Sequence, residues 1–183
     1  SNEFDAVDEI HFAGDNDIFA HSRDAIYVSP DKGENWSRTE VLYPYGVMNS
    51  FLPFSQQEFL TITVGSYPVV NDDGVEENKR TVVLNVSRDG GNTWDDTALI
   101  VSGLCGDLAK VDSVTAFLGG DDGYLLKTED RGRSWTKVET DVEFNFDQIK
   151  FIDHLRGFAY ANGTIFCRTF DGGVTWDSID MRK

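Results

Sequence analysis

Few residues of this chain have the types and spacing of a familiar reactive site. The three histidines, His11, His21 and His154, share no metal-ligand spacing in the sequence, and we interpret His11 and His154 as strand or turn residues. The two cysteines, Cys105 and Cys167, are compatible with one disulfide or with two unrelated buried thiols. The sequence therefore indicates neither a zinc site nor a nucleophilic centre of a known pattern.

Acidic residues are the commonest candidates for chemistry, because the chain contains 32 of them. Asp72, Asp73 and Glu76 offer the oxygen ligands that calcium prefers, but their spacing is not that of a known calcium loop. We interpret the segment around them as a solvated hairpin tip. Two carboxylates could also hydrolyse a glycoside, yet no pair stands out among so many. We expect no cofactor.

The net charge of −16 limits the kinds of partner. So acidic a surface repels phosphate groups, which disfavours nucleic acid and anionic membranes. No apolar run approaches the roughly 18 residues that a membrane-spanning helix needs, and we expect no membrane insertion. The sequence begins Ser1-Asn2-Glu3 without a methionine, so we expect a processed or cut chain and an exported, periplasmic or extracellular protein.

One motif, Ser/Thr-x-Asp-x-Gly-x-x-Trp, occurs four times, and we call it the box. The defining residues are Ser29, Asp31, Gly33 and Trp36; Ser87, Asp89, Gly91 and Trp94; Thr128, Asp130, Gly132 and Trp135; and Thr169, Asp171, Gly173 and Trp176. The last three box aspartates follow one another at about 41 residues, and a period of about 40 to 50 residues is typical of a four-stranded propeller blade.

Each box has the residues of a tight turn between two strands. The carboxylate accepts backbone N–H bonds from the turn, the hydroxyl bonds the same turn, and the glycine allows a positive φ. The tryptophan then buries a large apolar face while its N–H finds a partner. Because every residue type has a structural role, we interpret the boxes as structural and place them on the outer rim of the fold.

Three short apolar runs precede each box and a fourth follows it. In the fourth unit they cover residues 147–151, 157–160, 165–168 and 176–179; in the first unit they cover 8–12, 18–20, 25–28 and 36–41. Four short strands joined by Gly, Asp and Asn turns are typical of a propeller blade, and no segment has the capping signals of a helix.

We therefore predict an all-β fold, a β-propeller-like array of four four-stranded antiparallel blades. The blades cover residues 7–42, 47–101, 105–140 and 146–181 of a single domain, 1–183, and the second blade has an insertion at 67–80. No strand is left over to close a ring by pairing the first blade with the last. The array either closes as a small ring, belongs to a larger propeller with further blades, or covers its open edges with a second copy. We favour a fragment or a member of a larger assembly.

The boxes resemble the Asp-box, or BNR, repeats of the sialidase superfamily. The full unit, clearest in residues 149–153, 157–159 and 169–176, is more similar to photosystem II assembly and stability-factor-like proteins. The resemblance covers nearly the whole chain and implies a β-propeller. Function does not follow from it, because such propellers serve as hydrolases, lectin-like modules, receptors and assembly factors.

Sialidase activity, which the resemblance makes an alternative, would need three arginines that converge on a sugar carboxylate, a Tyr–Glu pair and an acid/base Asp. The family's Arg-Ile-Pro stretch is absent, and arginines such as Arg88, Arg131 and Arg133 lie in boxes. The chain is also short for the family's six blades. We therefore predict a non-catalytic binding or assembly module that recognises a protein or a glycan, with a sialidase or glycoside hydrolase-related domain as the alternative.

Overall fold

The structure, a computed structural model, describes residues 7–13, 15–41, 46–70, 73–95 and 106–179. All regular elements within these ranges are β-strands. The described residues include no helix long and apolar enough to cross a membrane.

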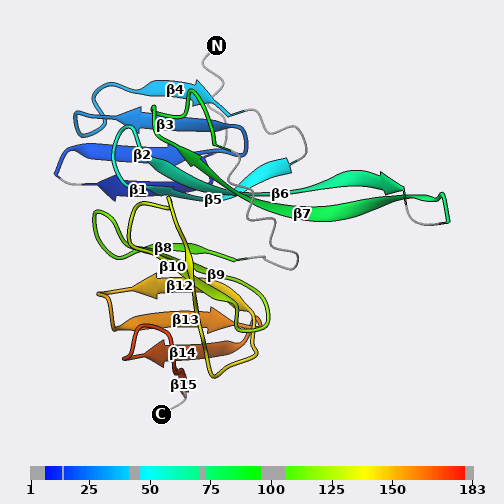
Figure 1. Ribbon diagram of the computed structural model, residues 1–183. Coiled ribbons are helices and arrows are strands. Elements are labelled where there is room, and N and C mark those ends of the chain that lie inside the picture. The colour runs from blue at the N-terminus through cyan, green and yellow to red at the C-terminus, as the bar shows by residue number, and fades with distance from the viewer. Residues whose placement is uncertain (1–6, 14, 42–45, 71–72, 96–105, 180–183) are drawn as a thin grey trace. The chain divides into compact units, whose positions relative to one another are not determined.

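The strands form four sheets, and in each sheet the strands follow one another in sequence and pair antiparallel (Figure 1). The first sheet contains β1 (Glu9–Ala13), β2 (Asp17–His21), β3 (Ala25–Ser29) and β4 (Ser37–Glu40); the second contains β5 (Gly46–Pro53), β6 (Phe59–Val70) and β7 (Glu76–Ser87); the third contains β8 (Leu108–Lys110), β9 (Ala116–Gly119), β10 (Leu125–Thr128) and β11 (Thr136–Val138); the fourth contains β12 (Phe146–Phe151), β13 (Gly157–Ala161), β14 (Ile165–Thr169) and β15 (Asp177–Ser178). This confirms the predicted all-β fold.

The second sheet differs from the other three, because only three of its strands lie in the described residues. A bridge between Val86 and Asp95 marks where the predicted fourth strand would begin. The remainder of that prediction, residues 96–101, lies outside the described residues. Four strands per blade are thus seen in the first, third and fourth sheets.

The chain divides into two compact units, residues 1–102 and 103–183. The first unit contains the first and second sheets, and the second unit contains the third and fourth. The single domain over 1–183 remains a prediction.

Aromatic side chains form the core of the first unit. Phe19 and Ile26 of the first sheet pack against Phe51 and Phe59 of the second, and all four are almost fully buried. The Phe51 and Phe59 ring centroids are 5.3 Å apart, and those of Phe19 and Phe59 are 5.9 Å apart. Strand β1 lies against β5, so the first strands of the two sheets are neighbours.

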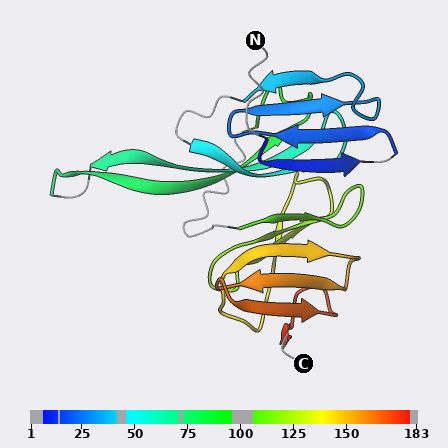
Figure 2. The ribbon, with the colours of Figure 1, turned by 180° about the vertical axis from the view of Figure 1, so that it is seen from behind.

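The second unit repeats this arrangement. Phe117 and Leu125 of the third sheet pack against Phe151 and Trp176 of the fourth, and β8 and β9 lie against β12 (Figures 1 and 2). The rings of Phe117 and Phe151 stack at 3.9 Å with an interplanar angle of 7°. Cys167 lies in the same core, where burial raises the pKa of its thiol.

The predicted insertion, residues 67–80, continues the two strands around it. The β6–β7 ladder runs without a break from Phe59 opposite Ser87 to Val70 opposite Glu76, and the hairpin projects past the end of β5 (Figure 1). Residues 73–78 at its end are exposed. Antiparallel ladders continue readily into a hairpin because each added pair forms its own backbone bonds. The inserted residues therefore lengthen two strands and place a solvated tip at their end.

Candidate functional site

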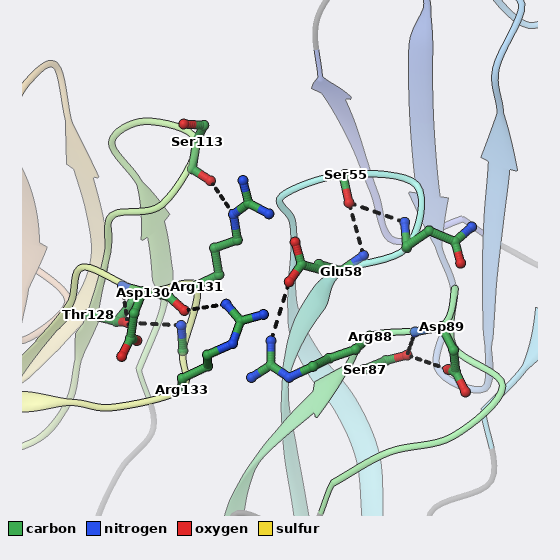
Figure 3. Close-up of polar contacts among 12 residues, drawn as sticks. Ser55, Glu58, Ser87, Arg88, Asp89, Ser113, Thr128, Asp130, Arg131 and Arg133 are labelled. Carbon is green, nitrogen blue, oxygen red and sulfur yellow. Dashed lines mark hydrogen bonds and ion pairs between the residues drawn. The ribbon is translucent and has the colours of Figure 1, made fainter.

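The four boxes form the same hydrogen-bonded turn at the ends of the third strands. In the second box, the Ser87 hydroxyl donates to Asp89 at 3.0 Å (Figure 3). The same hydroxyl accepts the N–H of Gly91 at 2.8 Å. The N–H and the hydroxyl of Thr93 donate to the two Asp89 carboxylate oxygens at 2.8 and 2.6 Å. The first, third and fourth boxes repeat the pattern with Ser29 and Asp31, Thr128 and Asp130, and Thr169 and Asp171.

The box carboxylates are held ionised by these bonds. In Asp31, Asp89 and Asp171 the hydrogen bonds from the residue four positions later are the largest cause of a lowered pKa. In Asp130 burial works in the opposite direction, but the bonds from Ser134 and Thr128 outweigh it and lower the pKa to about 2. A carboxylate whose two oxygens already accept turn bonds is a poor general acid. The box aspartates, in their ionised form, therefore hold the turns.

A pocket in the second unit lies beside the third box. The lining residues are Lys127, Glu129, Asp130, Ser134, Thr136 and Val138. Lys127 pairs with Glu129 at 2.7 Å, and Asp130 belongs to the box turn. The pocket thus brings together charges that already have partners.

Burial of the box tryptophans differs between sheets, although the sequence predicted a buried apolar face for each. Trp176 is 8% exposed and packs against Phe146, whereas Trp36 of the first box is 47% exposed. Both indoles donate to the box glycine carbonyl, at 2.9 and 3.0 Å. Trp176 is covered because its sheet packs on the third sheet. Trp36 is covered less because, among the described residues, no other sheet of its own unit packs against that face.

Two faces of each sheet can be defined by the register. In the first and third sheets we call the face that packs on the other sheet of the same unit the following face, and the opposite one the preceding face. Residues of the fourth sheet at equivalent register positions take the same names. Phe12 pairs with Ile18, which pairs with the box residue Ser29. In the fourth sheet, Phe151 pairs with Gly157, which pairs with the box residue Thr169. Phe12 and Phe151 thus occupy equivalent positions on the preceding faces of the first and fourth sheets.

These equivalent positions have opposite exposure. Ile149 and Phe151 of the fourth sheet are 1% and 9% exposed, whereas Ile10 and Phe12 of the first sheet are 56% and 74% exposed. In the described residues, the first sheet therefore presents to solvent the apolar side chains that the fourth sheet buries against its neighbour.

The following face of the fourth sheet is also apolar. Phe158 and Phe166 stack at 5.9 Å and are half-buried, while Phe117, the equivalent of Phe158 in the third sheet, is fully buried. Phe170 beside them is 57% exposed and lies under the Arg168 guanidinium. Each unit thus has an apolar sheet face that its own partner sheet does not cover.

Two of the three calcium candidates lie in the described residues. Asp73 and Glu76 are exposed at the end of the β6–β7 hairpin, and Asp72 lies outside the described residues. Cys105, the second cysteine, also lies outside them, and Cys167 has a free, buried thiol.

The histidines are arranged in a way that sequence spacing did not indicate. His154 pairs with Asp112 at 2.9 Å in the second unit. His11 and His21 meet in the first unit, with ring centroids 6.0 Å apart. They are ten positions apart in the chain, and only the pairing of β1 with β2 brings them together. A cross-strand register drawn for the predicted hairpin would have placed them on one face.

Comparison with known proteins supports the fold. No protein-family model matches the sequence, and no curated protein matches it either. Among solved structures, YCF48 from Cyanidioschyzon merolae matches with a TM-score of 0.65 at 15% identity, over 99% of this chain and 61% of that one. YCF48 bound to a D1 peptide matches with a TM-score of 0.61 at 14% identity, over 97% of this chain and 54% of that one.

These matches define the class of the protein. The four meander sheets with box turns have the fold of a β-propeller, and each sheet corresponds to a blade. The chain spans about three fifths and about half of the two YCF48 chains that it matches. At this level of identity the likeness concerns the fold.

Proposed function

We propose that this chain is a non-catalytic binding or assembly module and that its partner is a protein. The observation that carries the proposal is the open preceding face of the first blade, where Ile10 and Phe12 are exposed. Contiguous exposed apolar side chains mark contact surfaces more often than they mark solvated ones. The equivalent residues of the fourth blade are buried against protein, so the repeat itself indicates what kind of surface fits.

A protein surface suits this face better than a glycan does. The side chains are aliphatic and aromatic, and Trp36 adds a further half-exposed aromatic group. The side chains that cover the equivalent face of the fourth blade are Phe117 and Leu125. A partner with such side chains, either a further blade or a segment of another protein, would bury the face in the same way.

The matching structure of YCF48 bound to a D1 peptide adds an analogy at the level of the fold. It supports peptide recognition by a propeller of this architecture. The box carboxylates support the non-catalytic part of the proposal, because their oxygens are occupied within the turns.

The test compares binding to a peptide array with binding to a glycan array, using the full chain and two variants. Phe12→Ser removes an aromatic group that is 74% exposed from the open face. Val75→Ser is the matched control, because Val75 at the hairpin tip is an apolar side chain that is likewise exposed, at 55%. We expect the parent chain to bind peptides. The Phe12→Ser variant should bind them more weakly, and the Val75→Ser variant should bind them as the parent chain does. Selective glycan binding, or turnover of fluorogenic glycosides, would overturn the proposal.

A further inference from the structure

Strands β1 and β2 bring three metal-binding side chains to one face of the first blade. Glu9 pairs directly with His21 across the ladder, and His11 is two residues after Glu9 on the same strand. Alternate residues of a strand point to the same face, and directly opposed residues share a face. Glu9, His11 and His21 therefore lie together on the following face, the same face as Phe19.

The distances suit a small tetrahedral ion. Nε2 of His11 is 3.3 Å and Nε2 of His21 is 3.7 Å from Oε2 of Glu9. The three ligand atoms all lie within 4.8 Å of one another. With bonds of about 2.0–2.1 Å, tetrahedral zinc holds its ligand atoms about 3.4 Å apart. The Glu9–His11 distance matches this spacing, and the Glu9–His21 distance is slightly longer.

Each imidazole has a buried nitrogen that makes no well-aligned hydrogen bond, although the Glu9 carboxylate lies close to it. These nitrogens are Nε2 of His11 and Nε2 of His21, and the His21 side chain is only 3% exposed. Nδ1 of His21 lies 3.4 Å from the carbonyl oxygen of Ser22. A proton on Nδ1 would be donated to that carbonyl and would leave the Nε2 lone pair directed at the cluster. A buried polar atom without a well-aligned hydrogen bond is costly, and a metal ion would satisfy both nitrogens.

The surroundings hold the imidazoles in place and leave one side of the cluster accessible. The ring of Phe51 packs against both histidines, at 5.5 Å from His11 and 5.6 Å from His21. The Glu9 side chain is 44% exposed, so an ion can reach the cluster from the solvent. Three protein ligands with an accessible fourth position are typical of open zinc sites.

We propose that Glu9, His11 and His21 form a binding site for one divalent transition-metal ion of the zinc type. Two imidazoles and one carboxylate favour zinc and its neighbours over calcium or magnesium, which prefer six or more oxygen ligands. Water or a partner group supplies the fourth ligand. The ion would link β1 to β2 at the Glu9–His21 end of their ladder.

Calorimetric titration of the metal-free full chain with zinc chloride tests the proposal. We expect one zinc ion per chain. His11→Gln and Glu9→Gln are the informative variants, because these side chains are partly exposed and their loss leaves the core intact, whereas His21 is fully buried. Loss of an outer-shell partner alone costs about 10–100-fold in metal affinity, so we expect a loss of at least that size for His11→Gln.

The third histidine provides the matched control. His154 belongs to the second unit and pairs with Asp112, so His154→Gln should bind zinc like the parent chain. Far-ultraviolet circular dichroism confirms that each variant is folded. No binding at millimolar zinc, or equal affinity of the parent chain and the folded His11→Gln variant, would overturn the site. A loss in His154→Gln equal to that in His11→Gln would also overturn it.

Discussion

Replacing Phe12 and Phe151 with alanine, one at a time, compares the same side chain at equivalent positions of two blades. Phe151 stacks on Phe117 and is 9% exposed, whereas Phe12 is 74% exposed. A phenylalanine side chain can bury about 200 Å², and each Å² of apolar area contributes about 25 cal/mol. Phe151 therefore contributes about 4 kcal/mol to the free energy of unfolding, and Phe12 contributes about 1 kcal/mol.

Urea unfolding followed by tryptophan fluorescence measures both values, because each unit contains two of the four tryptophans. Trp36 and Trp94 report on the first unit, and Trp135 and Trp176 report on the second. We expect Phe151→Ala to shift the transition of the second unit strongly and Phe12→Ala to shift that of the first unit only slightly. If a second copy covers Phe12 in solution, the cost of Phe12→Ala will instead rise with protein concentration.

The result that would refute the reasoning is a loss of stability in Phe12→Ala, independent of concentration, that equals the loss in Phe151→Ala. It would mean that other residues of the chain cover Phe12 and that the open face does not exist. Sedimentation of the parent chain over the same concentration range separates self-association from this outcome.

Further predictions concern the boxes. Because Asp130 has a folded pKa of about 2, below its ordinary value of 3.8, its contribution is complete above about pH 4 and is lost as the pH falls toward 2. Asp130→Asn should therefore cost on the order of 1 kcal/mol at neutral pH and less at pH 2, as acid titration of stability will measure. Gly33 and Gly173 both have a φ of +91°. Gly33→Ala should cost about 1 kcal/mol from backbone strain, and Gly173→Ala should cost more, because its Cβ would lie 2.4 Å from Leu125; thermal unfolding measures the difference.

Two outcomes would contradict these predictions. A loss of stability in Asp130→Asn that is constant with pH would show that the turn needs the shape of the side chain and not its charge. Equal costs for Gly33→Ala and Gly173→Ala would show that Leu125 moves aside freely, against its full burial.

The strands and turns could be predicted from the sequence because their determinants are local. The predicted run at 165–168 became β14 (Ile165–Thr169), since alternation and the following box define it within a few residues. Exposure could not be predicted in the same way. Trp36 and Trp176 occupy the same place in identical motifs, and their burial depends on whether another sheet packs against them.

The histidine cluster was missed for a related reason. Glu9 and His21 are neighbours only through the register of the β1–β2 ladder, and a search for metal ligands by spacing along one strand does not find them. The calcium candidates were suggested by local composition, but Asp73 and Glu76 lie at an exposed hairpin end. Local composition thus drew attention to the tip, which we interpreted as a solvated hairpin, and gave no sign of the cluster on the first sheet.

The box turn satisfies its own polar groups within about eight residues, whereas the apolar faces of a blade can be satisfied only by a neighbour. Duplicating a unit therefore costs little at the turn, but each added blade brings apolar faces that a neighbouring blade or another partner must cover. Repeat proteins generally solve this with terminal units whose outer faces are polar. The first and fourth blades each have an exposed aromatic side chain, Phe12 and Phe170, where a polar one would suit an outer face. Polar substitutions at these two positions would be the first step in engineering this segment into a self-standing building block.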